Sequence, residues 1–136
     1  MTLAMVKDIT FAQRFEELQL FLSNLVETLD VSVMLIDVNG FITLVNEAVT
    51  RRVGIPKQKL VSLHISEYIQ LIRADLPVDF FEEIKQGKQL SREVTHESPS
   101  GRKHIYVNMV PVSDDQGKVI GAVAMATDLT DLKIRQ

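Results

Sequence analysis

Two basic side chains on one predicted strand are the residues best placed to do chemistry. Arg92 and His96 alternate with Val94 in the segment 89–97, so the three side chains share one face of the strand. If Val94 points into the interior, Arg92 and His96 line the same pocket. A buried Arg or His is costly without an anion or a hydrogen-bond partner. The pattern therefore predicts a binding site for a small organic acid or another polar metabolite.

The same segment allows a second interpretation, in which neither basic side chain serves a ligand. Ser91, Glu93 and Thr95 can face inward near the strand edge instead. Alternatively, Val94 stays inside while the long side chain of Arg92 extends to solvent. Sequence alone leaves these alternatives open.

The sequence lacks the residue sets of the common enzyme classes. It has no cysteine, which excludes disulfides, thiolate metal sites and cysteine nucleophiles. It also shows no metal-ligand spacing, no glycine-rich phosphate loop and no Ser/His/Asp set. Asp114 and Asp115 lie in a predicted turn without a partner carboxylate. We therefore predict a regulatory domain without a metal or a catalytic residue, with any catalysis in a separate domain.

Length and charge limit the classes of partner that the chain is expected to bind. The chain has 136 residues, 46% hydrophobic, which suits one folded domain. A net charge of −3 gives no reason to expect direct contact with nucleic acid or an anionic membrane. No apolar run approaches the roughly 18 residues of a membrane span, and no signal peptide is evident. The expected location is the cytoplasm, without membrane contact.

The elements follow from changes in hydrophobic period. Residues 1–30 form a predicted linker and an amphipathic helix, and residues 32–45 a hairpin with a turn at Gly40. Asn46 should cap a helix that ends at Gly54, and further short helices are expected within 62–72 and from Pro77 to Gly87. The segments 89–97, 103–112 and 119–127 are predicted strands. This order indicates an α+β fold, with an antiparallel sheet and helices on one face.

The N-terminal helix carries a heptad pattern of apolar residues. Their spacing of four and three is typical of a coiled-coil seam. The seam residues are Phe11, Phe15, Leu18, Leu22, Leu25 and Leu29. The pattern predicts a homodimer through this helix, but it also suits an amphipathic helix that packs on its own domain.

Residues 31–130 resemble the PAS family of sensory domains. Residues 35–48 read LIDVNGFITLVNEA, similar to the family pattern I-D-x-x-G-x-I-x-x-x-N-x-A. Further matches are Gly54-Ile55-Pro56, the turn at 113–121 and the terminal Asp128-Leu129-Thr130. The resemblance implies a five-stranded antiparallel sheet of order 2-1-5-4-3, with short helices enclosing a small pocket on one face.

The resemblance also assigns roles to residues. The expected ligand-binding residues are Arg92, Val94, His96, Phe80, Phe81, Val107 and Met109. Asp128 and Thr130 lie where the last strand passes to an output helix, which residues 131–136 would begin. Both side chains can cap backbone amides at that point, so capping and signal relay are compatible roles.

Three cofactor classes of the family are disfavoured. A flavin adduct and a thioester-linked chromophore each need a cysteine, and the chain has none. Haem in the well-known branch is held by a histidine on the helix before strand three, and residues 78–86 contain no histidine. A small organic acid or another metabolite therefore remains the expected ligand.

The expected function is a sensory input domain that binds a small ligand or dimerises. It would relay a change to a downstream output domain in the same protein, a histidine kinase or a transcriptional activator. The alternative is a ligand-free PAS dimerisation scaffold. Asp8-Ile9-Thr10 repeats the Asp128 junction 120 positions earlier. We therefore expect Met1 to lie within a tandem array of such domains.

Overall fold

The computed structural model describes residues 17, 20, 24 and 31–130. The chain divides into two units, residues 1–30 and 31–136, and the second contains the sheet. The predicted dimer seam and the predicted start of the output helix at 131–136 fall outside the described residues.

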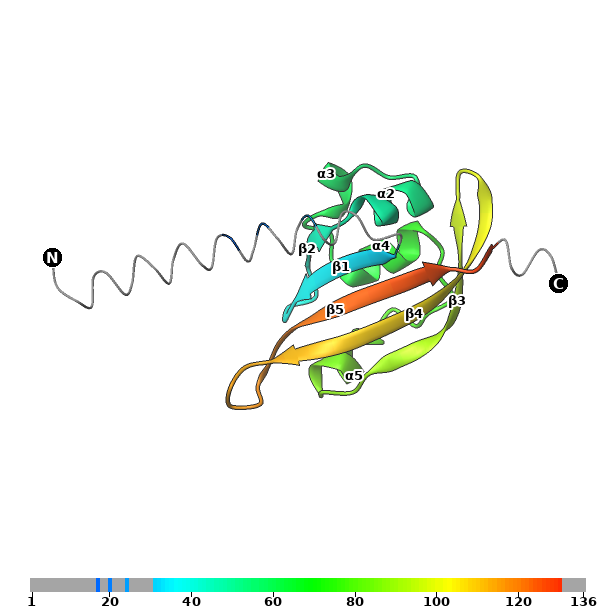
Figure 1. Cartoon of the computed structure of the whole chain (residues 1–136). Helices are drawn as coiled ribbons and strands as arrows, with labels where there is room; N and C mark the ends of the chain where they lie inside the picture. The colour runs from blue at the N-terminus through cyan, green and yellow to red at the C-terminus, as the bar shows by residue number, and fades with distance from the viewer. Residues whose placement is uncertain (1–16, 18–19, 21–23, 25–30, 131–136) are drawn as a thin grey trace, which may run out of the picture. The chain divides into compact units, whose positions relative to one another are not determined.

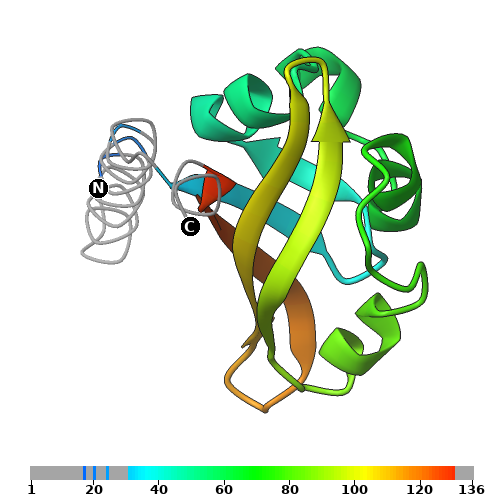
Figure 2. The ribbon, with the colours of Figure 1, turned by 90° about the vertical axis from the view of Figure 1, so that its right-hand side faces the viewer.

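A five-stranded antiparallel sheet of order β2-β1-β5-β4-β3 forms one layer (Figure 1). Figure 2 shows the short helices gathered on one face of this sheet. Both features confirm the predicted α+β fold and strand order. The strands are β1 (Ser32–Asp37), β2 (Ile42–Val45), β3 (Leu90–Ser98), β4 (Gly101–Ser113) and β5 (Val119–Asp128). The helices are α2 (Glu47–Val53), α3 (Lys57–Leu60), α4 (Ile65–Leu71) and α5 (Phe81–Lys85).

The helix α4 lies within the predicted segment 62–72, whereas α5 begins later than predicted. Ser62 and Leu63 pair with β2, since Ser62 N donates to Ile42 O at 2.8 Å and Ile42 N donates to Leu63 O at 2.9 Å. The helix α4 therefore starts at Ile65, where the His64 side chain accepts a hydrogen bond from Ser66 N. Residues 77–80 form a turn, so α5 begins at Phe81 rather than near Pro77.

The opposite edge of the sheet also has a partner outside the strands. Asp75 N donates to Thr95 O at 3.0 Å, and the Asp75 carboxylate accepts a bond from Thr95 N at 2.8 Å. Glu97 N donates to Ile72 O at 2.7 Å. The segment after α4 therefore follows the outer edge of β3.

Two glycines permit close packing around the sheet. At Gly121 in β5, an added Cβ would lie 2.7 Å from Ile36 O of β1, so the glycine allows the close approach that the sequence predicted. Gly54 ends α2 in the left-handed region, with φ of 73°, and a Cβ there would meet Pro99 at 2.7 Å. The β3–β4 turn thus packs against the end of α2.

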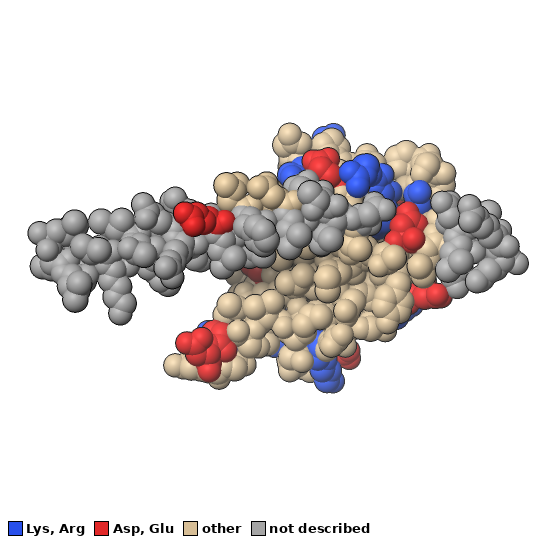
Figure 3. All heavy atoms as spheres, viewed as in Figure 1, with Lys and Arg blue, Asp and Glu red and all other residues tan. Residues whose placement is uncertain are grey.

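The core lies between the helices and the inner face of the sheet. One cluster includes Ile36, Val49, Ile69, Phe81 and Met109, all buried. A smaller cluster joins Val94, Ile105, Val107 and Ala126 across three strands. The other face of the sheet is less covered. Figure 3 shows charged side chains mainly at the margins of the described surface in that view.

Asn46 fastens α2 to the first strand. Its side chain is fully buried and binds three backbone groups. Oδ1 accepts from Val33 N at 3.0 Å and from Val49 N at 3.3 Å, while Nδ2 donates to Val31 O at 2.8 Å. The predicted N-cap is confirmed, and the same amide also holds the start of β1.

Replacing Asn46 with Ala should lower the free energy of unfolding by about 2–4 kcal/mol, because it removes the cap and leaves the buried Val33 amide unpaired. Urea denaturation measures this loss. The exposed Asn39→Ala is the matched control and should stay within about 0.5 kcal/mol of wild type. Equal effects of the two substitutions would contradict the role of Asn46.

Candidate functional site

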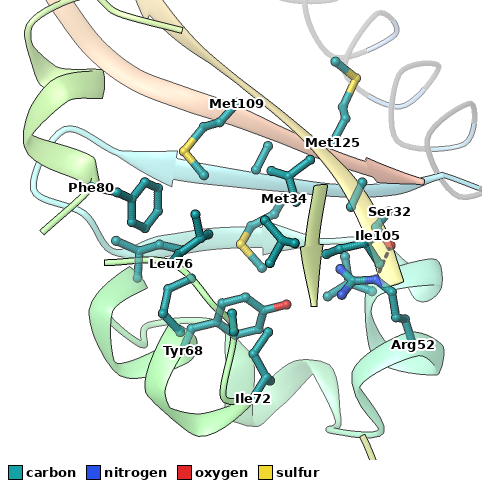
Figure 4. Close-up of a pocket in the computed structure, with 18 residues that line it drawn as sticks. Ser32, Met34, Arg52, Tyr68, Ile72, Leu76, Phe80, Ile105, Met109 and Met125 are labelled. Atoms are coloured by element: carbon teal, nitrogen blue, oxygen red, sulfur yellow. Dashed lines mark hydrogen bonds between the residues drawn. The ribbon is translucent and has the colours of Figure 1, made fainter. Parts of the chain in front are cut away.

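A small cavity lies between the inner face of the sheet and the helices (Figure 4). Its volume is about 50 Å³. Its walls are mostly apolar, with Met34, Leu76, Phe80 and Met109 around it. Polar groups reach it from Ser32, Arg52 and Tyr68. The cavity is therefore an apolar chamber with a cation at one end.

Four of the seven side chains predicted to bind a ligand line the cavity. They are Phe80, Val94, Val107 and Met109. Phe81 is buried in the main core beside Phe80, with the two rings in an edge-to-face contact. Phe81, Arg92 and His96 are not among the lining residues.

Arg92 does not reach the interior, so its expected place in the pocket was wrong. Its side chain is 45% exposed, and its guanidinium lies 3.9 Å from the Asp75 carboxylate. It also donates to the backbone carbonyl of Asp75 at 3.3 Å. The strand β3 is at the edge of the sheet, so a long side chain can turn past that edge toward solvent. This matches the second interpretation of the sequence.

His96 points inward and is fully buried, as expected if Val94 is inside. Its Nδ1 lies 3.0 Å from the carbonyl of Glu97, and its Nε2 lies 2.6 Å from Arg52 Nη1. A carbonyl only accepts and a guanidinium only donates, so Nδ1 carries the proton and Nε2 accepts. The partner that buried His96 requires is therefore a protein side chain.

Arg52 is the functional candidate that the sequence reasoning missed. It is 8% exposed, and its Nε donates to Ser32 Oγ at 3.1 Å. Basic residues in the last turn of a helix normally complement the helix dipole at the surface. The signal for burial was the spacing, because Arg52 lies on the same helix face as the buried Ala48 and Val49.

The pKa of His96 lies below its usual value of 6.5. Burial is the main cause, since a desolvated imidazolium is disfavoured. The hydrogen bond to the Glu97 carbonyl acts in the opposite direction, and the charge of Arg52 lowers the pKa further. The structure therefore holds His96 in its neutral form beside a permanent cation.

Asp128 and Thr130 form a hydrogen-bonded unit at the exit of β5. Asp128 Oδ1 accepts from Thr130 N at 2.9 Å, and Thr130 Oγ1 accepts from His104 N of β4 at 3.0 Å. Lys103 Nζ lies 3.9 Å from the other oxygen of Asp128. Partial burial acts to raise the pKa of Asp128, but the bonds from Thr130 and the Lys103 charge outweigh it, so the pKa is lowered.

Other chemistry is not evident in residues 31–130. That part of the chain contains no group of three or more His, Asp or Glu residues arranged to hold a metal ion. Its helices are also too short and too polar for any of them to cross a bilayer.

Acid should destabilise the domain through His96. Below pH 6.5 His96 binds a proton in the unfolded chain but stays neutral in the folded chain, because its pKa there is lowered. The free energy of unfolding therefore falls as the pH falls. One such proton gives a slope of up to about 1.4 kcal/mol per pH unit. Urea denaturation at several pH values should show a steeper fall for wild type than for His96→Gln. Parallel curves would contradict this assignment.

Comparisons with known proteins agree with the fold. A family profile described as the PAS fold matches residues 20–129. The PAS domain of an HTR-like protein from Haloarcula marismortui is 17% identical, with coverage of 88% of this chain and 98% of that one, at a TM-score of 0.65. A PAS domain from a two-component sensor histidine kinase is 19% identical, with coverage of 83% and 98%, at a TM-score of 0.61.

A third solved structure, an RNA-binding Light-Oxygen-Voltage receptor, is 16% identical at a TM-score of 0.70. The alignment covers 85% of this chain but only 34% of that receptor. At these identities the likeness shows the fold alone. A comparison with curated proteins gave no match. Because the family profile spans most of the chain and the sheet has the expected strand order, this chain belongs to the PAS family.

Proposed function

We propose that this PAS domain is the sensory input of a larger signalling protein. A change in its cavity would reach a downstream output domain through the end of β5. The output is a histidine kinase or a transcriptional regulator in the same protein, which would place the module in the cytoplasm. A kinase PAS domain among the similar folds is in keeping with the first. The predicted heptad helix at 11–29 would join two copies.

A series of neighbouring polar residues between the cavity and the end of β5 supports this proposal. Arg52 lines the cavity and binds His96 of β3 at 2.6 Å. His96 is the register partner of Lys103 in β4, which lies 3.9 Å from Asp128 of β5. Asp128 in turn accepts a bond from Thr130 N at 2.9 Å. A shift of Arg52 would therefore alter the electrostatic environment of the exit junction.

A ligand-free dimerisation scaffold is the second candidate. One observation favours it, because a cavity of about 50 Å³ is far smaller than the pockets of typical drug-sized ligands. In that role the domain would hold two chains together without a change in its interior. Energetic coupling between Arg52 and Asp128 distinguishes the two functions, because a sensory relay requires this coupling and a passive scaffold does not.

A double-mutant cycle measures that coupling. Arg52→Met removes the buried charge, and Asp128→Asn removes the anion but keeps an acceptor for Thr130 N. Their effects on the free energy of unfolding should differ from additivity by about 0.5 kcal/mol or more. The control pairs Arg52→Met with Asp114→Asn, whose Oδ1 caps the β4–β5 turn in the same way. In the control pair, the effects of the two substitutions on the free energy of unfolding should be additive within about 0.3 kcal/mol. Additivity in both pairs would contradict the relay.

Signal output can be tested by fusion to a histidine-kinase catalytic core, with the segment after Thr130 kept in register. Thr130→Val keeps the volume but removes the hydroxyl that accepts from His104 N. Autophosphorylation should change by about fivefold or more, a coupling in the usual range for allosteric links. Asp114→Asn should leave it at the wild-type level. A Thr130→Val fusion as active as wild type would refute the proposed exit.

A further inference from the structure

The guanidinium of Arg52 is a buried cation with neutral partners. It makes two side-chain hydrogen bonds, to the Ser32 hydroxyl and to neutral His96. A guanidinium has five N–H donors, so these bonds use only part of its capacity. Figure 4 shows the group pointing from α2 into the cavity. Buried charges in proteins are normally paired with an opposite charge.

No described residue supplies that opposite charge by direct contact. Among the ion pairs between residues 31 and 130, none includes Arg52. Asp128 acts on Arg52 only through its field, since its carboxylate is bound to Thr130 and Lys103. His96 cannot compensate the charge, because its free nitrogen accepts from Arg52 as a neutral group. An anion at the Arg52 end of the cavity would complete the site.

The remainder of the cavity limits the size and polarity of that anion. One water-sized atom needs roughly 10–15 Å³ of such volume, so about 50 Å³ holds on the order of four heavy atoms. Phe80, Leu76 and Met109 form the end away from Arg52. A second charged group there would be buried without a partner, which excludes dicarboxylates.

We propose that the cavity binds a monocarboxylate of about two carbons, with acetate as its simplest form. Its carboxylate would bind Arg52, and its methyl group would face the apolar wall of the cavity. This inference rests on the proposed sensory function and names the ligand class for the same cavity. Such a ligand would neutralise Arg52, the first member of the contacts that lead to Asp128.

Isothermal titration calorimetry of the full chain tests the proposal with acetate and with acetamide, its uncharged isostere, at matched ionic strength. Acetate should bind at least about tenfold more tightly, as expected for a charge-assisted hydrogen bond. Arg52→Met should abolish this preference. The control is Arg51→Met, an exposed neighbour on the same helix, which should keep it.

A second variant keeps the test valid if Arg52→Met fails to fold. Ala126→Val narrows the cavity without touching the cation, so it should weaken acetate binding by about tenfold. The methyl NMR signal of Met109, which lines the cavity, should respond to acetate in wild type and not in Ala126→Val. Equal binding of acetate and acetamide, no acetate binding, or equal effects of the two arginine variants would overturn the proposal. Absent binding with an intact Arg52–Asp128 coupling would refute the ligand alone. Binding without that coupling would refute the relay alone.

Discussion

The buried amide of Asn46 is the contact on which the arrangement of the domain depends. It joins the first residues of β1 to the first turn of α2, two segments that the β1–β2 hairpin brings together. Once the start of α2 is fixed, its helical spacing carries Arg52 to the inner face of the sheet. There Arg52 meets Ser32, the first residue of β1. One capping residue therefore positions Arg52, the charged side chain among the described residues that line the cavity.

The inner face of the sheet changes character along its length. Near Phe80 and Met109 its surroundings are apolar, whereas near the end of β5 it carries His96 and Asp128, with Arg52 of α2 bound to His96. Burial of a cation among neutral partners costs stability, and stability alone would favour an apolar residue of similar volume. Departures of this kind from consistent packing are expected at functional sites. The polar end therefore departs from what folding stability alone would favour.

Sequence reasoning succeeded where the signal was local. The turn at Gly40, the cap at Asn46 and the strand periodicity each depend on neighbouring residues, and all appear in the structure. It failed where the outcome depends on distant segments. Alternation placed His96 inside but could not reveal Arg52, 44 positions away, as its partner. Nor could it show that Arg92 lies on an edge strand, or that Ser62 and Leu63 pair with Ile42 of β2.

Both edges of the sheet are occupied by chain that is not itself a strand. Ser62 and Leu63 take the free backbone groups of Ile42 on one side, while Ile72 and Asp75 take those of Thr95 and Glu97 on the other. An open edge is a template on which another chain can add a strand, and such addition leads to aggregation. In this domain the segments on either side of α4 cover part of each edge, at Ile42 of β2 and at Thr95 and Glu97 of β3. At these positions a second copy cannot extend the sheet, so the domain favours association through side chains over strand addition.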